Sequence, residues 1–119
     1  MQYALLIYNE PGAMEALSPQ EQEEVGREYW DIRAEPGMVG GAGLQTTETA
    51  TTVRAENGKV LVTDGPFADT KEILAGFFLF EAANLDEATK MAARLPVVTR
   101  LGGSVEIRPV SVERGQSPL

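Results

Sequence analysis

Histidine and cysteine are both absent from this chain of 119 residues. Without cysteine the chain forms no disulfide, thiolate nucleophile, iron–sulfur cluster or cysteine-based zinc site. Without histidine it lacks the base of a Ser-His or Cys-His dyad and the commonest ligand of transition metals. Acid–base chemistry therefore falls to Asp, Glu, Lys or Tyr, whose pKa values must shift for work near neutral pH. An all-carboxylate magnesium or calcium site is an open alternative, but the sequence contains no ordered ligand spacing such as D-x-D-x-D-G. We predict no metal site and no cofactor.

Basic residues are also scarce, with 10 Lys and Arg against 18 Asp and Glu and a net charge of −8. The imbalance lies in residues 1–48, where nine acids face only Arg27 and Arg33. Because negative charge repels phosphate, we expect binding neither to nucleic acid nor to an anionic membrane. The acidic surface is more typical of a solubility device than of a binding face. No apolar run approaches the ~18 residues of a membrane helix, and residues 1–4 do not resemble a signal peptide, so we expect a cytoplasmic protein.

The chain length fits one domain, which we assign to residues 1–110, followed by a flexible tail at 111–119. Asn57-Gly58, between two β-prone runs, is the strongest hairpin signal. The glycine-rich segment 37–46 predicts a strand rather than a phosphate loop, because no Lys-Ser/Thr and no helix follow it. The expected elements are strands at 3–8, 37–46, 51–56, 59–63, 74–81 and 104–110, one helix from Ser18-Pro19 to Pro36, and a second from Asn84 to Pro96 with Leu85, Ala88, Met91, Ala92 and Leu95 on its inner face.

This order predicts an α+β fold, a ferredoxin-like split βαβ sandwich. Two helices cover only one face of such a sheet, yet the strands at 3–8 and 74–81 are apolar on both faces. An uncovered apolar face needs a cover. We expect a homodimer in which two sheets pack face to face as a dimeric α/β barrel. A loop crossing the sheet within one chain is the alternative.

The densest group of chemically useful residues follows the predicted hairpin, at residues 64–72. Asp64, Lys71 and Glu72 are the candidate catalytic residues, since carboxylates and an ammonium group on a loop can exchange protons with a small polar or anionic ligand. Burial would raise the pKa of Asp64 and a neighbouring Lys71 would lower it. The candidate substrate-binding residues are Tyr8, Phe67 and Thr70.

A purely structural interpretation of the same segment is also open. Asp64-Gly65-Pro66 has the composition of a tight turn, in which the Asp side chain bonds the backbone and Gly adopts positive φ. In that interpretation Phe67 fills a gap in the core.

The segment Asp-Gly-Pro-Phe-Ala-Asp-Thr-Lys-Glu at 64–72 resembles the signature of the DGPF-domain branch of the YCII-related family. The resemblance continues through Met1–Tyr8, Leu17–Glu21, Glu48–Arg54 and Gly103–Val110 and covers nearly the whole of residues 1–110.

The resemblance implies a dimeric α/β barrel built from ferredoxin-like protomers. Enzyme activity has been inferred for family members that carry a His–Asp pair in a cleft, and that pair cannot be transferred to a chain without histidine. The motif residues Asp64, Thr70, Lys71 and Glu72 are the candidates that the resemblance carries over. It also implies a link to extracytoplasmic-function sigma factors.

Three functional hypotheses follow. The first is a small-molecule-binding protein or enzyme with a cleft between the sheet and the 64–72 loop, where Asp64 performs isomerase- or lyase-like acid–base chemistry. The second is a non-catalytic interaction module that binds a regulatory protein through the acidic face of the first helix, including Glu23 and Glu24. The third is a domain retained for assembly, in which the motif is structural.

Overall fold

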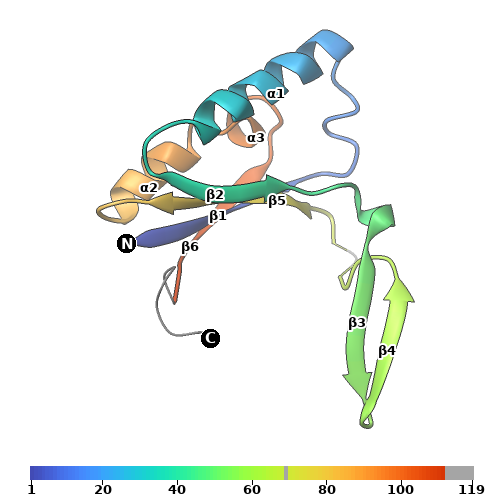
Figure 1. Cartoon of the computed structure of the whole chain (residues 1–119). Helices are drawn as coiled ribbons and strands as arrows, with labels where there is room; N and C mark the ends of the chain where they lie inside the picture. Colours follow the sequence, from blue (N-terminus) through green and yellow to red (C-terminus); the bar gives the residue numbers. More distant parts are fainter. Residues whose placement is uncertain (69, 112–119) are drawn as a thin grey trace.

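The main sheet contains four antiparallel strands in the order β2-β5-β1-β6. In the computed structural model, which describes residues 1–68 and 70–111, three helices lie on one face of this sheet (Figure 1). The elements are β1 (Gln2–Asn9), α1 (Pro19–Arg33), β2 (Met38–Gly43), the short 3₁₀ helix η1 (Thr47–Thr49), β3 (Thr51–Glu56), β4 (Lys59–Asp64), β5 (Ile73–Glu81), α2 (Leu85–Ala92), α3 (Pro96–Thr99) and β6 (Ser104–Pro109). This arrangement confirms the α+β class and is consistent with the ferredoxin-like prediction.

The core lies between the helices and one face of the sheet. Side chains alternate along a strand, so every second residue of β1 and β5 points to the helices. Tyr3, Leu5, Ile7, Phe78 and Phe80 are buried on this side. Ala88, Met91, Leu95 and Val97 cover them from α2 and the segment that follows it.

Among the described residues, no helix lies on the opposite face of the sheet (Figure 1). Its central residues are apolar: Leu6 pairs with Phe77, and Ala4 pairs with Leu79. All four are only half-buried. We call this surface, formed by Ala4, Leu6, Phe77 and Leu79, the open face. Its exposure agrees with the predicted need for a cover, and the identity of that cover, a second copy, stays a prediction.

Strands β3 and β4 pair only with each other and form a hairpin that projects from the domain (Figure 1). Asn57 (φ 50°) and Gly58 (φ 78°) occupy its turn, which confirms the predicted hairpin, and their positive φ values are typical of a type I′ turn. We call residues 51–64 the arm. Its projection agrees with the radius of gyration, 16.1 Å, which exceeds the about 13.5 Å expected of a compact chain of this length.

Helix α1 begins at the predicted cap. The Ser18 hydroxyl accepts a hydrogen bond from the Glu21 N–H, and the Glu21 carboxylate accepts one from the Ser18 N–H, which completes a capping box. Of its residues only Val25 and Ile32 are buried, so the helix contacts the core along a narrow stripe.

Two details of the second helical region differ from the prediction. Leu85, placed on the inner face of the helix, is 56% exposed, because at the first helical position it lies beyond the edge of the core. Pro96 does not simply end the helix: it starts the separate short helix α3, where a proline at the first position loses no intrahelical hydrogen bond.

Of the predicted tail, residues 112–119 lie outside the described residues. Within the part of the chain that is described, we find no helix with the length and apolar character that crossing a membrane requires.

Candidate functional site

A pocket of about 590 Å³ opens between α1 and the ends of β1, β2 and β5. Figure 1 shows α1 rising away from the sheet toward its N-terminal end, and the segment between β1 and α1 closes the wedge on that side. Residues 9–15 of this segment and residues 44–48 after β2 form the rim. We call this cavity the α1 pocket.

The inner wall of the α1 pocket is apolar. It includes Ile7, Val25, Phe78 and Leu101, and Tyr29 of α1 borders it as well. The Tyr29 and Phe78 rings lie 6.1 Å apart between centroids, tilted by 35°. A cavity of this volume whose surface is mainly apolar, with polar side chains such as Asn9, Gln45 and Thr46 at its border, is typical of small-molecule sites.

The Tyr29 hydroxyl contacts the backbone of α3. Its phenol oxygen accepts a hydrogen bond from the Val97 N–H at 3.2 Å, which holds the ring between α1 and α3. Burial raises the pKa of Tyr29 to about 12, and the hydrogen bond from Val97 offsets only part of that effect. At neutral pH the phenol is therefore protonated and is a hydrogen-bond donor rather than a base.

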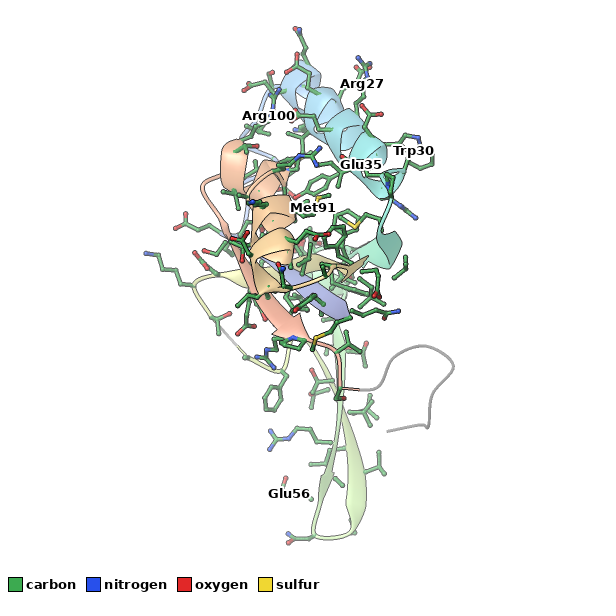
Figure 2. The ribbon with its side chains drawn as sticks, turned by 90° about the vertical axis from the view of Figure 1, so that its left-hand side faces the viewer. Arg27, Trp30, Glu35, Glu56, Met91 and Arg100 are labelled. Atoms are coloured by element: carbon green, nitrogen blue, oxygen red, sulfur yellow. The ribbon has the colours of Figure 1, made fainter. Side chains whose placement is uncertain are left out.

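Charged side chains lie at the rim. Glu10, Glu15 and Glu48 border the pocket together with Arg33, and all four are exposed. The Arg33 guanidinium lies 5.7 Å from the centroid of the Trp30 ring, which is on the outer side of α1 in Figure 2. Three carboxylates against one guanidinium give the rim a net negative charge.

The strand ends that form the floor of the pocket are irregular. The pairing of β1 with β5 shifts register between Ile7 and Tyr8, so Ile7 pairs with Gly76 and Tyr8 with Leu74. The residue left out of the pairing is Ala75, whose carbonyl oxygen accepts a hydrogen bond from the Leu44 N–H at 2.8 Å. Bulges of this kind are common beside functional sites. Here the bulge fixes the segment after β2 at the rim of the pocket.

The six site residues predicted from the sequence lie elsewhere. Tyr8 is half-buried near the end of β1, Asp64 ends β4 and is exposed, and the others belong to the segment between the arm and β5. The Thr70 hydroxyl donates a short hydrogen bond to the carbonyl oxygen of Glu72. Asp69, part of the same motif, lies outside the described residues. The residues that line the α1 pocket do not include Tyr8, Asp64, Phe67, Thr70, Lys71 or Glu72.

Of the turn chemistry predicted for the start of the motif, the positive φ of Gly65 is confirmed. Gly65 has φ 101°, its N–H donates to the Ala50 carbonyl at 2.8 Å, and its own carbonyl accepts from the Thr52 hydroxyl at 2.7 Å. The expectation that Phe67 fills the core is wrong, since its side chain is 76% exposed. The Arg54 guanidinium lies 5.6 Å from the centroid of that ring, and the stacking occurs on the surface.

The acidic face of α1 is partly neutralised by ion pairs. Glu23 pairs with Arg27 at 3.2 Å. Arg100, which lies next to α3 in Figure 2, pairs with Glu24 at 3.1 Å and with Glu28 at 2.5 Å. Glu23 and Glu24, which we expected to contact a regulatory protein, are thus already ion-paired within the chain. The acidic face of α1 therefore has less unpaired negative charge than the sequence indicated.

The sequence reasoning missed the residues of α1 that border the pocket. Gly26, Tyr29 and Arg33 are not among the site residues that the sequence predicted. Gly26 was the sequence signal that could have indicated this site. A glycine in the interior of a helix with a capping box destabilises that helix, so its presence suggests a functional or packing role.

Comparison with known proteins identifies the family. The model of the YCII-related domain matches residues 1–114. The chain belongs to the YCII-related family. An uncharacterized protein of Rhizobium meliloti (strain 1021) is 40% identical over 123 residues, which cover 99% of each chain.

Among solved structures, the chain is similar to the 5-chloro-2-hydroxyhydroquinone dehydrochlorinase of Burkholderia phenoliruptrix in complex with 2,5-dihydroxybenzoquinone. The TM-score is 0.54 at 15% identity, with 98% of this chain and 100% of the other covered. At 15% identity, this similarity shows that the two proteins share a fold. It does not show that they share a reaction.

Proposed function

We propose that this YCII-related protein binds a small molecule in the α1 pocket. The observation that carries the proposal is the cavity of about 590 Å³ between α1 and the ends of β1, β2 and β5. The apolar lining residues Leu44 and Leu74 are 48% and 40% exposed, and leaving them beside an empty space forfeits packing contacts. An occupant that buries these side chains would restore the contacts.

The similar dehydrochlorinase structure supports the proposal, because that enzyme has the same fold and its structure contains a ring compound. Its reaction is not transferred. A His–Asp pair cannot form in a chain with no histidine. Binding is therefore the function that the geometry supports best.

A fragment screen by ligand-observed NMR tests the proposal, with 2,5-dihydroxybenzoquinone among the probes. Leu44 is half-exposed at the rim, and Leu44→Trp places an indole where a ligand would enter. The matched control is Leu61→Trp, a comparably exposed position on the arm. We expect wild type and Leu61→Trp to bind the same fragments and Leu44→Trp to lose them. Equal binding by all three proteins, or binding by none, would contradict the proposal.

We also propose that the chain belongs to the DGPF-domain branch of the family and forms a dimer through the open face. The nine-residue segment at 64–72 supports the first point. Two apolar surfaces support the second: the open face and one side of the arm, where Val53, Val60 and Val62 are 64%, 70% and 63% exposed. A two-stranded hairpin with such a surface is marginally stable in water by itself.

A second candidate function is acid–base chemistry at residues 64–72, with Asp64 as the base, Lys71 and Glu72 beside it, and Tyr8, Phe67 and Thr70 as ligand contacts. The observation that favours it is the fixed start of the loop: the two hydrogen bonds of Gly65 hold the end of β4 and present Asp64 to solvent. Substitution of Asp64, discussed below, separates this candidate from the α1 pocket.

A further inference from the structure

Gly26 lies in the interior of α1 and borders the α1 pocket. A glycine in the interior of a helix costs about 1 kcal/mol relative to alanine, because it loses more backbone freedom on folding. At many helical positions that cost is offset because a side chain would collide with a neighbouring element. A Cβ added at Gly26 would have no such contact within 4 Å among the described residues. Packing within the chain therefore does not explain the glycine.

The missing side chain instead leaves the backbone of α1 uncovered at the border of the pocket. Gly26 is exposed, lines the cavity and has open space in front of it, so a ligand in the pocket can approach the backbone there. Gly43, at the end of β2, borders the same cavity and likewise has no neighbour within 4 Å of an added Cβ. Gly76 is different, since a Cβ there would lie 2.8 Å from the Ala42 carbonyl oxygen, so the close approach of β2 and β5 already requires glycine.

The polar groups of the pocket restrict the charge of the occupant. The exposed carboxylates of Glu10, Glu15 and Glu48 outnumber the single Arg33 guanidinium. A phosphorylated ligand would therefore be repelled at the rim. The uncharged polar residues of the lining, Asn9, Gln45, Thr46 and Thr47, suit a hydroxyl or carbonyl oxygen on an otherwise apolar molecule.

We propose that the α1 pocket selects a flat, uncharged ring compound with an oxygen substituent, and that Gly26 determines this specificity by letting the ring lie against the backbone of α1. The inference rests on the proposed function, small-molecule binding in the same pocket. It adds the class of ligand and a specificity-determining residue.

Three matched probes test the class of ligand. Naphthol is flat, uncharged and carries one hydroxyl; naphthyl phosphate adds charge; decahydronaphthol keeps the hydroxyl and replaces the flat rings with thicker saturated ones. We expect wild type to bind naphthol about tenfold or more tighter than either of the others, as measured by fluorescence titration for the aromatic pair and by competition for the saturated alcohol.

Gly26→Ala tests the residue. The variant is expected to raise the unfolding temperature, because alanine favours the helix, and to weaken naphthol binding about tenfold or more, because the methyl group occupies the space of the ring. A variant that bound less well because it was misfolded would also be less stable. A higher unfolding temperature together with weaker binding therefore points to a local effect of the methyl group. The control is Asp31→Ala, an exposed position of the same helix outside the α1 pocket. It replaces an acid near the helix C-terminus by a better helix former, so we expect stability to rise and naphthol binding to stay the same.

Different failures have different meanings. Unchanged naphthol binding in Gly26→Ala would overturn the role of Gly26. Equal binding of naphthyl phosphate or decahydronaphthol, or wild type that binds other fragments in the α1 pocket but not naphthol, would overturn the ligand class and leave the proposed function intact. Wild type that binds neither these probes nor any fragment of the screen would overturn the proposed function as well.

Discussion

The phenol oxygen of Tyr29 accepts a hydrogen bond from the backbone N–H of Val97 at 3.2 Å, and this bond joins α1 to the first turn of α3. The first N–H groups of a helix have no partner within the helix, and Leu95, at the cap position, offers none through its side chain. Tyr29 therefore completes the start of α3 and also borders the α1 pocket. The same side chain connects the candidate site to the stability of the core.

Tyr29→Phe is expected to lower the free energy of unfolding by about 1–3 kcal/mol, because it leaves the N–H of a fully buried Val97 without its acceptor. Urea denaturation measures the change. The control is Tyr8→Phe, since Tyr8 is half-buried on β1 and lies outside this contact. An equal loss in both variants would show that the Tyr29 hydrogen bond contributes nothing specific.

The pH dependence of stability provides a separate measurement of the same residue. The pKa of Tyr29 is raised from 10.0 to about 12 by burial, so the folded chain holds this proton more tightly than the unfolded chain does. Below pH 10 the phenol is protonated in both states and the contribution is constant. As the pH rises from about 10 to about 12, the unfolded state releases the proton first and stability falls.

The difference between wild type and Tyr29→Phe isolates this effect from the other groups that titrate at high pH. We expect the unfolding free energies of the two proteins to converge between about pH 10 and pH 12, as measured by urea denaturation at each pH. A gap that stays constant across that range would contradict the assigned pKa.

Local signals in the sequence predicted most of the elements. Ser18 with Glu21 located the start of α1, and Asn57-Gly58 located the turn of the arm, because caps and tight turns depend on a few adjacent residues. The two-faced apolar character of β1 and β5 indicated a sheet with one uncovered face, which the structure contains.

The position of the candidate site was not predicted. It depends on how far α1 stands from the sheet, which long-range packing decides and the local sequence does not state. The site was predicted at residues 64–72 because that segment contains several carboxylates, a lysine and a threonine. The pocket is instead bordered by residues of low chemical reactivity such as Gly26 and Ile7. The exposure of Phe67 has a similar cause: an aromatic residue after a turn predicts burial only if the loop folds back on the core, and this one lies beside the arm.

The open face leads to a prediction about assembly. Leu6 lies at its centre, paired with Phe77, so Leu6→Glu would place a charge inside a sheet-to-sheet interface. We expect wild type to be a dimer by native mass spectrometry and Leu6→Glu to be a monomer. Far-UV circular dichroism checks that the variant still folds.

Val98→Glu is the matched control, because Val98 is 41% exposed on α3, on the side of the sheet that the helices cover. It should stay dimeric. A monomeric wild type would contradict the account of the open face, and a dimeric Leu6→Glu would assign the interface to another surface, with the apolar side of the arm as the next to test.

Asp64→Asn separates the two proposed functions. Asp64 is exposed at the end of β4 and does not line the α1 pocket, so we expect the unfolding free energy to change by no more than about 0.5 kcal/mol and naphthol binding to be unchanged. Fluorescence titration and urea denaturation measure the two quantities. The control is Asp31→Asn, an equally conservative change at an exposed position of α1.

Loss of binding in Asp64→Asn with a stable fold would contradict the pocket as the whole site and support the motif as its acid–base component. In a dimer, that component would come from a second copy, because within one chain Asp64 lies outside the pocket. Unfolding of the variant would instead make the motif structural, since the turn at Gly65 would then depend on the charge of Asp64 beside it. The three results assign residues 64–72 to three different roles.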